Sequence, residues 1–372
     1  MSVTDETPAV DDEVDLGDLD AANREAEWRP DRRGVVARLA VTAGIVVVVG
    51  LTPLLVGDTD VNLVSRAAVY AIVALSMNVI VGYTGQVSLG HQAFLGMGAF
   101  GAGYGLTEMG LPWFGALVMA GLTGAVAAVG LGAVALRLAG LYLALVTIAF
   151  GLFAQETLFK IRELTGGGAG QTANRPAFFS GDIAYAYLCL IVLLGAILFD
   201  WRLVSSRAGR AIQALRDDER VAASWGINVT GYKLLAFVIS GILAGIAGAL
   251  YASIEQVVSS ADFTFGLALT FLLMTVVGGV GNRWGVVIGG VFFAILPTLL
   301  DRAHANFHFI PFSLIEATWE PAIGALLLLL TLIAYPGGIA QQLSPVLNWL
   351  EFRRFSHERH EGSATGGMGA RP

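Results

Sequence analysis

Four polar residues lie close together in a stretch that is otherwise glycine-rich and apolar. They are Gln86, Ser88, His91 and Gln92, within GYTGQVSLGHQAF. Their side chains are neutral hydrogen-bonding groups, and such groups are costly in an apolar interior unless they find partners. Two roles fit them: lining a water-filled path for a polar solute, or forming structural hydrogen bonds between helices. For His91 taken alone, the structural role is the better fit.

A second polar stretch, residues 201–231, carries charge and is named here the polar segment. Its charged residues include Arg202, Arg207, Arg210, Arg216, Asp217, Asp218, Glu219 and Arg220. A charge at the bilayer centre costs about 2.5–3.5 kcal/mol on the insertion scale, so the segment lies outside the bilayer, and its arginines favour the cytoplasmic side. Apolar residues near helical spacing predict a short helix over residues 209–224, ended by Gly226. The segment is either a solvated loop or a docking surface for a cytoplasmic partner.

Catalytic motifs are missing from the sequence. A phosphate-binding loop requires GxxxxGK[ST], but Lys160 follows Phe159 and Lys233 follows Tyr232. No nucleophile elbow and no HExxH zinc pair occur either. We therefore expect no enzyme activity, and if ATP drives this protein, a separate subunit supplies the ATPase.

Metal-dependent and proton-coupled functions find little support. His304 and His308 would lie one helical turn apart with Asp301 nearby, but no further metal ligand is evident, so we expect no metal. The acidic residues Glu156, Glu255 and Glu320 lie near the ends of apolar runs, where side chains reach water. A proton-coupled carrier would place carboxylates deeper, which argues against secondary transport without excluding it.

The elements that must position these residues are membrane-spanning helices. Of 372 residues, 55% are hydrophobic, 14% are charged and 47 are glycine, whereas soluble domains carry roughly 25% charged residues. We predict an all-α polytopic membrane protein with about ten transmembrane helices, or eight to ten if the two weakest runs are re-entrant half-helices. The runs are residues 35–56, 61–82, 86–106, 112–136, 139–159, 183–199, 232–253, 265–277, 284–300 and 321–335.

The glycine interruptions suggest an internal symmetry. Glycines break residues 82–91, and Gly278, Gly279 and Gly281 break the eighth run at its end. Broken segments at matching places in two halves are the best sequence pointer to a substrate path. An inverted repeat of five plus five helices, with the path between its broken helices, is the resulting hypothesis.

The ends of the chain differ from its body. Residues 1–33 are acidic and poor in large apolar side chains, which predicts a disordered cytoplasmic tail. Residues 34–340 form the predicted membrane domain, and residues 341–372 form a second cytoplasmic tail. Basic clusters beside the first and last runs hold both termini inside the cell.

Four segments resemble, in order, those of the permeases of branched-chain amino-acid ABC transporters, the Liv type. They are GYTGQVSLGHQAFLGMGAF, GLYLALVTIAFG, GRAIQALRDDERVAASWGINVTGYKLLAFVISGILAGIAGALYA and FLLMTVVGGVGNRWGVVIGG. The resemblance covers residues 63–336. The loop before the sixth run and the stretch GINVTGYKLLAF resemble the M-type rather than the H-type subunit.

This resemblance implies that the polar segment is a coupling helix docked on an ATPase. Importer permeases carry E-A-A, three residues, then G. Here Glu219, Ala222, Ala223 and Gly226 take similar places, although two residues separate Glu219 from Ala222 and two separate Ala223 from Gly226. Arg216 and Asp218 are expected to belong to the same ATPase-coupling surface.

The resemblance also implies partners and a substrate. The partners would be an H-type permease, two cytoplasmic ATPases that use ATP and Mg²⁺, and an extracytoplasmic binding protein, while this chain binds no cofactor. Gln86, Ser88, His91, Gln92, Gly278, Gly279 and Gly281 would line the path through the cell membrane. Branched-chain or related amino acids are the expected substrates. Urea or short amides are the alternative, and an ion-coupled secondary carrier or channel is a less favoured one.

Overall fold

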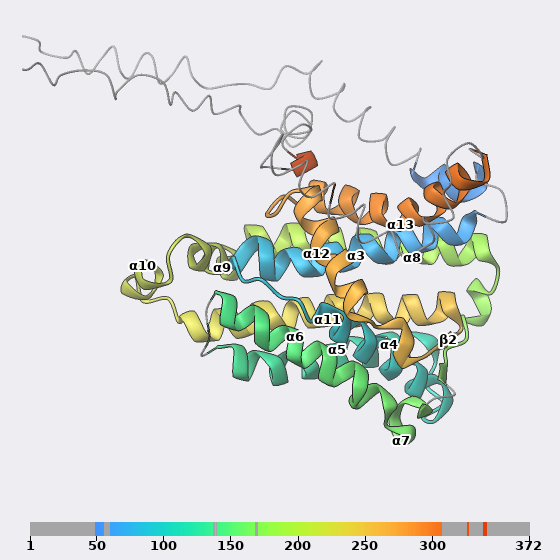
Figure 1. Cartoon of the computed structure of the whole chain (residues 1–372), viewed down its shortest axis with the longest axis horizontal. Helices are drawn as coiled ribbons and strands as arrows, with labels where there is room; N and C mark the ends of the chain where they lie inside the picture. The colour runs from blue at the N-terminus through green and yellow to red at the C-terminus, as the bar shows by residue number, and fades with distance from the viewer. Residues whose placement is uncertain are drawn as a thin grey trace, which may run out of the picture. The chain divides into compact units, whose positions relative to one another are not determined.

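A computed structural model describes residues 49–55, 60–136, 138, 140–167, 170–306, 326 and 338–340. The two predicted tails, most of the first predicted span and nearly all of the tenth lie outside these residues. The described part is mostly helical, and Figure 1 shows its long helices running side by side. They are α3 (Val61–Thr84), α4 (His91–Thr107), α5 (Trp113–Ala135), α6 (Leu141–Glu156), α8 (Asp182–Ser205), α11 (Val229–Glu255), α12 (Phe265–Gly278) and α13 (Arg283–Asn306).

Seven helical segments in the described part are long and apolar enough to cross a membrane. The chain is therefore a multi-pass, mostly helical membrane protein, which confirms the predicted class. Helix α4 is too short to count among the seven, with 17 residues. The total of about ten spans and the five-plus-five repeat stay predictions.

Helices α3 and α11 form the centre of the bundle. Of the most apolar window of α3, 83% is buried inside the protein, against 28% for the window of α6. A helix that is apolar on all sides is typical of such a central position. Glycine residues allow the facing helices to approach each other closely. A Cβ on Gly98 would lie 2.2 Å from the carbonyl oxygen of Gly245, and one on Gly124 would lie 2.1 Å from that of Gly241. The many glycines thus pack α4 and α5 against α11.

The two ends of the bundle differ. At one end, named here the polar end, α8 leads into α9 (Arg207–Asp217) and α10 (Glu219–Ser224), which project beyond the long helices (Figure 1). At the far end, β1 (Gln171–Thr172) pairs antiparallel with β2 (Val257–Val258). Short helices lie beside this sheet: η1 (Leu158–Lys160), α7 (Arg162–Thr165), η3 (Ala177–Phe179) and η4 (Ser260–Asp262). The loop between α6 and α8 is therefore tied to the bundle by a small sheet that the sequence did not predict.

Two predicted elements have different boundaries. The single helix expected over residues 209–224 is two helices, because Asp218 adopts an extended backbone and caps α10. Its carboxylate accepts the backbone N–H groups of Arg220 at 2.7 Å and Val221 at 3.2 Å. The third span was predicted from residue 86, but it becomes helical only at His91. Gly85 ends α3 with a φ of +71°, and residues 85–90 form a non-helical connection between the two helices.

Candidate functional site

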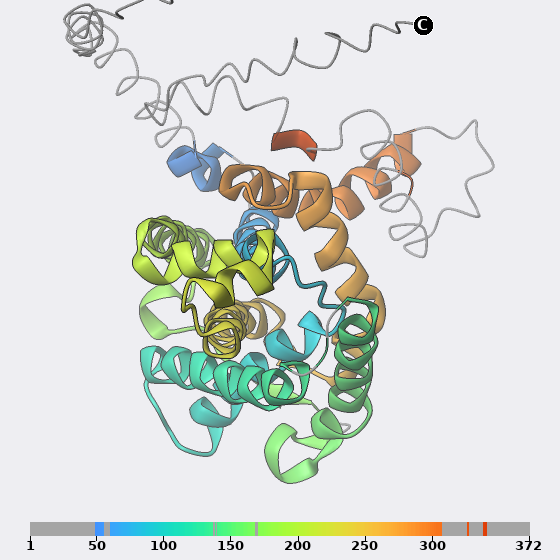
Figure 2. The ribbon, with the colours of Figure 1, turned by 90° about the vertical axis from the view of Figure 1, so that its left-hand side faces the viewer.

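Helices α9 and α10 lie across the polar end of the bundle. Figure 2 looks at the protein from this end, with both helices in front. The Ser206 side chain caps α9 by accepting the N–H of Gly209 at 3.0 Å. Ile212 and Leu215 are buried against the bundle, whereas all four charged residues of α9 are exposed. The polar segment is therefore a pair of amphipathic helices packed on the membrane-spanning body.

Glu219, expected at a docking rim, is paired within the chain. Its carboxylate lies 2.6 Å from Nζ of Lys233 in the first turns of α11. The Lys233 side chain is only 6% exposed. This ion pair links the start of α10 to the start of α11. No role in this segment was predicted for Lys233 from the sequence.

The two alanines of the coupling motif point in different directions. Ala222 is 3% exposed and packs inward, whereas Ala223 is exposed. Gly226 follows with a φ of +78° and open space at its Cβ position, which explains why glycine suits the end of α10. On the outer side, Val221 and Trp225 are 53% and 82% exposed. These two apolar side chains, one turn apart, form an exposed surface that the sequence reading overlooked. A tryptophan inside a charged segment was the available signal.

Arg216 reaches into the bundle from the last turn of α9. Its guanidinium Nη1 donates to the carbonyl oxygen of Gly82 at 2.7 Å. A Cβ on Gly281 would lie 2.6 Å from the same nitrogen. Arg216 thus contacts both glycine-interrupted segments, at the ends of α3 and α12. Asp218 also serves the fold here, as the cap of α10.

The two interrupted segments contact each other directly. The N–H of Gly281 donates to Oδ1 of Asn78 on α3 at 2.8 Å. A Cβ on Gly82 would lie 2.9 Å from the nitrogen of Gly281. Gly279, with a φ of +115°, turns the chain after α12, and Gly278 packs against Gly285 of α13. The structure therefore brings residues 82 and 281 together although 199 positions separate them.

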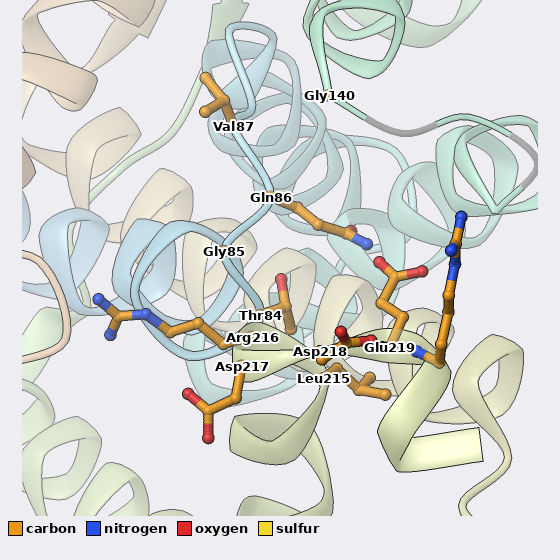
Figure 3. Close-up of a pocket in the computed structure, with 11 residues that line it drawn as sticks. Thr84, Gly85, Gln86, Val87, Gly140, Leu215, Arg216, Asp217, Asp218 and Glu219 are labelled. Atoms are coloured by element: carbon orange, nitrogen blue, oxygen red, sulfur yellow. Dashed lines mark hydrogen bonds between the residues drawn. The ribbon is translucent and has the colours of Figure 1, made fainter. Parts of the chain in front are cut away.

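A cavity of about 550 Å³ lies at the polar end. The cavity is lined by Thr84, Gly85, Gln86, Val87, Gly140, Leu215, Arg216, Asp217, Asp218, Glu219 and Arg220. In Figure 3 the Gln86 and Glu219 side chains point toward each other across it. One wall is the segment that leads from α3 to α4, and the opposite wall is the junction of α9 and α10. Of the four predicted polar path residues, only Gln86 lines this cavity.

The other three polar residues lie deeper, around the start of α4. Ser76 Oγ lies 2.7 Å from Nε2 of His91 and donates to the carbonyl oxygen of Ser240 at 2.8 Å. In return, the Ser240 hydroxyl donates to the carbonyl oxygen of Ser76 at 2.8 Å. All three side chains are fully buried. This network joins α3, α4 and α11 through Nε2 of His91, and the structural role favoured for His91 stays a prediction.

Several buried polar atoms have no hydrogen-bond partner among the described residues. Two, Oγ of Ser65 and Nδ2 of Asn78, lie on α3, and four lie around the start of α4: Oγ of Ser88, both amide atoms of Gln92 and Nδ1 of His91. Ser88 and Gln92 are themselves fully buried. Buried polar groups without partners cost free energy. The atoms around the start of α4 are therefore able to form hydrogen bonds to another molecule or to water.

A buried ion pair at the polar end was missed from the sequence. Asp200, near the end of α8, is fully buried and lies 2.5 Å from Nε of Arg283 at the start of α13. The Tyr83 hydroxyl donates to both of its carboxylate oxygens at 3.0 Å. The position of Asp200 directly after an apolar run could have indicated a buried charge. The same position is equally typical of a residue at the membrane surface.

Metal ligands do not cluster in the part of the chain that the structure describes: no group of three or more His, Cys, Asp or Glu side chains could hold a metal ion there. His308, one of the residues considered for a metal site, lies outside the described residues.

The comparison with known families decides the class of this protein. Residues 61–335 match the family model for the permease component of branched-chain amino acid transport systems. The chain belongs to this family of permeases. The resemblance predicted from four sequence segments is thereby confirmed, and so is the expectation of a transport protein rather than an enzyme.

Individual relatives agree with this family. The chain is 32% identical over 298 residues to the high-affinity branched-chain amino acid permease protein LivM of Salmonella typhimurium, covering 73% of this chain and 70% of that one. It is 32% identical to LivM of Escherichia coli over 276 residues, covering 67% and 65%. To LivH of Escherichia coli it is 24% identical over 304 residues, covering 75% and 93%. The higher identity to LivM fits the expected M-type. No solved structure matches the chain.

Proposed function

We propose that this permease forms half of the translocation path of an ABC importer for branched-chain or related amino acids. Its partners are an H-type permease, two cytoplasmic ATPases that bind ATP and Mg²⁺, and an extracytoplasmic binding protein. This chain holds no nucleotide. The protein lies in the cell membrane with its polar end in the cytoplasm, since the arginines of α8, α9 and α10 gather there.

The observation that carries this proposal is the placement of α10 and its exposed surface. Val221, Ala223 and Trp225 project from the polar end and are exposed in the part of the chain that the structure describes. Tryptophan is enriched among residues that dominate binding, and small residues allow a helix to lie close in a groove. The surface is proposed to enter a cleft on the ATPase, with the exposed residues Arg207, Arg210 and Arg220 at the rim.

The route for the substrate is proposed to pass the unpartnered polar atoms and the cavity. Ser88 and Gln92 offer neutral hydrogen-bonding groups inside the bundle, and Gln86 stands at the cavity of the polar end. Residues 85–87 of the break before His91 line this cavity, so their backbone groups can also bond a solute there. ATP binding would then shift the pore between inward-open and outward-open states.

Urea and short amides are a second candidate substrate class. The groups with free bonding capacity are hydroxyl, amide and imidazole, and none of them carries a fixed charge. Such groups suit a neutral amide as well as a zwitterion. Competition of unlabelled leucine and unlabelled urea against uptake of each labelled solute separates the two.

The test is copurification of the chain from its native membranes. We expect a second permease and two ATPases with the wild-type chain, and loss of the ATPases in a variant with residues 219–226 scrambled. Scrambling residues 162–167, which comprise α7 (Arg162–Thr165) and the two glycines after it at the far end, is the matched control and should retain the ATPases. A chain that purifies without ATPases and still transports would contradict the proposal and support an ion-coupled carrier or channel.

A further inference from the structure

Two oppositely charged residues, Asp200 near the end of α8 and Arg216 in the last turn of α9, contact neighbouring residues of the same two segments. Before α9, Asp200 accepts the Tyr83 hydroxyl and pairs with Arg283. At the end of α9, Arg216 donates to Gly82 and touches the Gly281 position. Residues 82 and 83 close α3, whereas residues 281 and 283 connect α12 to α13.

The glycines in this cluster admit the polar groups that reach them. A Cβ on Gly82 would lie 2.0 Å from Oδ1 of Asn78, and one on Gly281 would lie 2.6 Å from Nη1 of Arg216. Real Cβ atoms do not come so near, so any larger residue would push the Asn78 amide or the Arg216 guanidinium away. Gly281 also has a φ of +87°, which side chains rarely adopt. The approach of Arg216 to the second segment depends on Gly281, and the contact between the two segments depends on Gly82.

The ion pair of Asp200 is buried, with Asp200 0% and Arg283 12% exposed. Buried ion pairs contribute little net stability compared with apolar residues, but removing one partner is strongly destabilising. The hydrogen bonds of such a pair require a particular geometry. When one partner moves, the other must therefore move with it, or the pair breaks. A cluster of this kind is suited to discrete arrangements rather than gradual deformation.

We propose that Asp200 and Arg216 are positioning residues that transmit the displacement of α9 to both glycine-interrupted segments at once. This inference rests on the proposed function, because the displacement comes from the ATPases. When the coupling helices move, Arg216 carries Gly82 and Gly281 with it. Asp200, on the helix that leads into α9, carries Tyr83 and Arg283, and the segment 85–90 before His91 moves with its anchor at Gly82. The number of substrate molecules transported per ATP hydrolysed therefore depends on both residues.

The experiment uses the complete complex reconstituted in lipid vesicles, with leucine uptake and ATP hydrolysis measured on the same sample. Arg216→Gln is expected to lower leucine transported per ATP roughly tenfold, while copurification of the ATPases and the rate of hydrolysis remain at the wild-type level. Arg216→Lys is expected to restore part of the ratio, since it can donate to Gly82. Arg162→Gln, an exposed arginine on α7 at the far end, is the control and should leave the ratio unchanged.

A second pair of variants tests Asp200. Asp200→Asn is expected to lower the same ratio, and Asp200→Asn with Arg283→Gln, which removes both charges, to recover stability but not coupling. An unchanged ratio in Arg216→Gln would overturn the inference, as would full recovery of coupling in the uncharged double variant. Absence of ATPases from the wild-type complex would instead be a failure of the proposed function, so the two failures are distinguishable.

Discussion

Lys233 Nζ lies 2.6 Å from the carboxylate of Glu219, so the junction between α10 and α11 is closed by an ion pair within the chain. The lysine is 6% exposed and the glutamate 41%. The residues of the coupling motif therefore have two different roles, one in the fold and one in contact with a partner. Glu219 stabilises the shape of the polar segment, and the exposed neighbours of Glu219 on α10 remain free to contact a partner.

Removing the charge of Glu219 should destabilise the protein. Glu219→Gln leaves the buried Lys233 ammonium without its counter-charge, which we expect to cost about 1–3 kcal/mol after allowing for the half-exposed carboxylate. Thermal unfolding of the purified chain in detergent measures this. Asp217→Asn, which neutralises an exposed carboxylate two residues away, should change the unfolding temperature little. An equal shift in both variants would mean that the ion pair does not stabilise the junction.

The two alanines of α10 offer a matched comparison. Ala222→Trp must fit a bulky ring where the native side chain is 3% exposed, so it should cost about 1–3 kcal/mol or more through overpacking. Ala223→Trp places the same ring in solvent and should leave the unfolding temperature near that of the wild type. We expect only the second variant to fold normally while losing copurification of the ATPases. Normal uptake by Ala223→Trp would contradict the docking assignment.

Trp225 should contribute strongly to partner binding and little to the fold. The side chain is 82% exposed, and loss of such an aromatic anchor typically costs at least about 2 kcal/mol of binding energy, or roughly thirtyfold in affinity. Trp225→Ala should therefore weaken ATPase binding in a titration of the purified permease in nanodiscs. Its unfolding temperature should stay unchanged. Phe178→Ala, which truncates an equally exposed aromatic residue at the far end (93% exposed), is the control for nonspecific surface effects.

Gly90 is required for the close approach of the segment before α4 to α6. A Cβ at this position would lie 2.0 Å from the carbonyl oxygen of Thr147, which is backbone and cannot rotate away. Gly90→Ala should therefore displace the start of α4 and cost about 1–3 kcal/mol, seen as a lower unfolding temperature. Gly130→Ala on α5 meets no atom within 4 Å and should be neutral or slightly stabilising. Equal stability of the two variants would show that the contact is not tight.

The sequence predicted the membrane-spanning helices better than the contacts between them. Helix α3 was expected over residues 61–82 and spans Val61–Thr84. This prediction was close because the ends of an apolar run can be read from the local sequence, where charged residues and glycines begin. The pairing of Lys233 with Glu219 was missed, since it depends on how two helices are arranged in space. The break at Asp218 was also missed, although aspartate before a glutamate-led turn is a recognised cap pattern.

The candidate path was only partly predictable for the same reason. Polarity within an apolar span pointed to Gln86, Ser88, His91 and Gln92 as a group. The structure divides them: Gln86 lines the cavity, His91 bonds to Ser76, and Ser88 and Gln92 have unpartnered atoms among the described residues. No local pattern separates these cases, because each depends on which neighbouring helix faces the side chain.

The unpartnered atoms allow structural and transport roles to be separated. A buried hydroxyl or amide without a partner is destabilising, so Ser88→Ala and Gln92→Leu should leave the unfolding temperature unchanged or raise it. If these side chains bond the solute in transit, both variants should nevertheless reduce uptake, by about tenfold for the loss of one hydrogen bond to a polar substrate. Ser240→Ala, which removes a hydroxyl bonded to the Ser76 carbonyl, should behave in the opposite way: it should lower stability by about 0.6–1.7 kcal/mol and leave uptake per folded molecule close to wild type. Uptake at the wild-type level in both Ser88→Ala and Gln92→Leu would remove these residues from the path and direct attention to the backbone of residues 85–90.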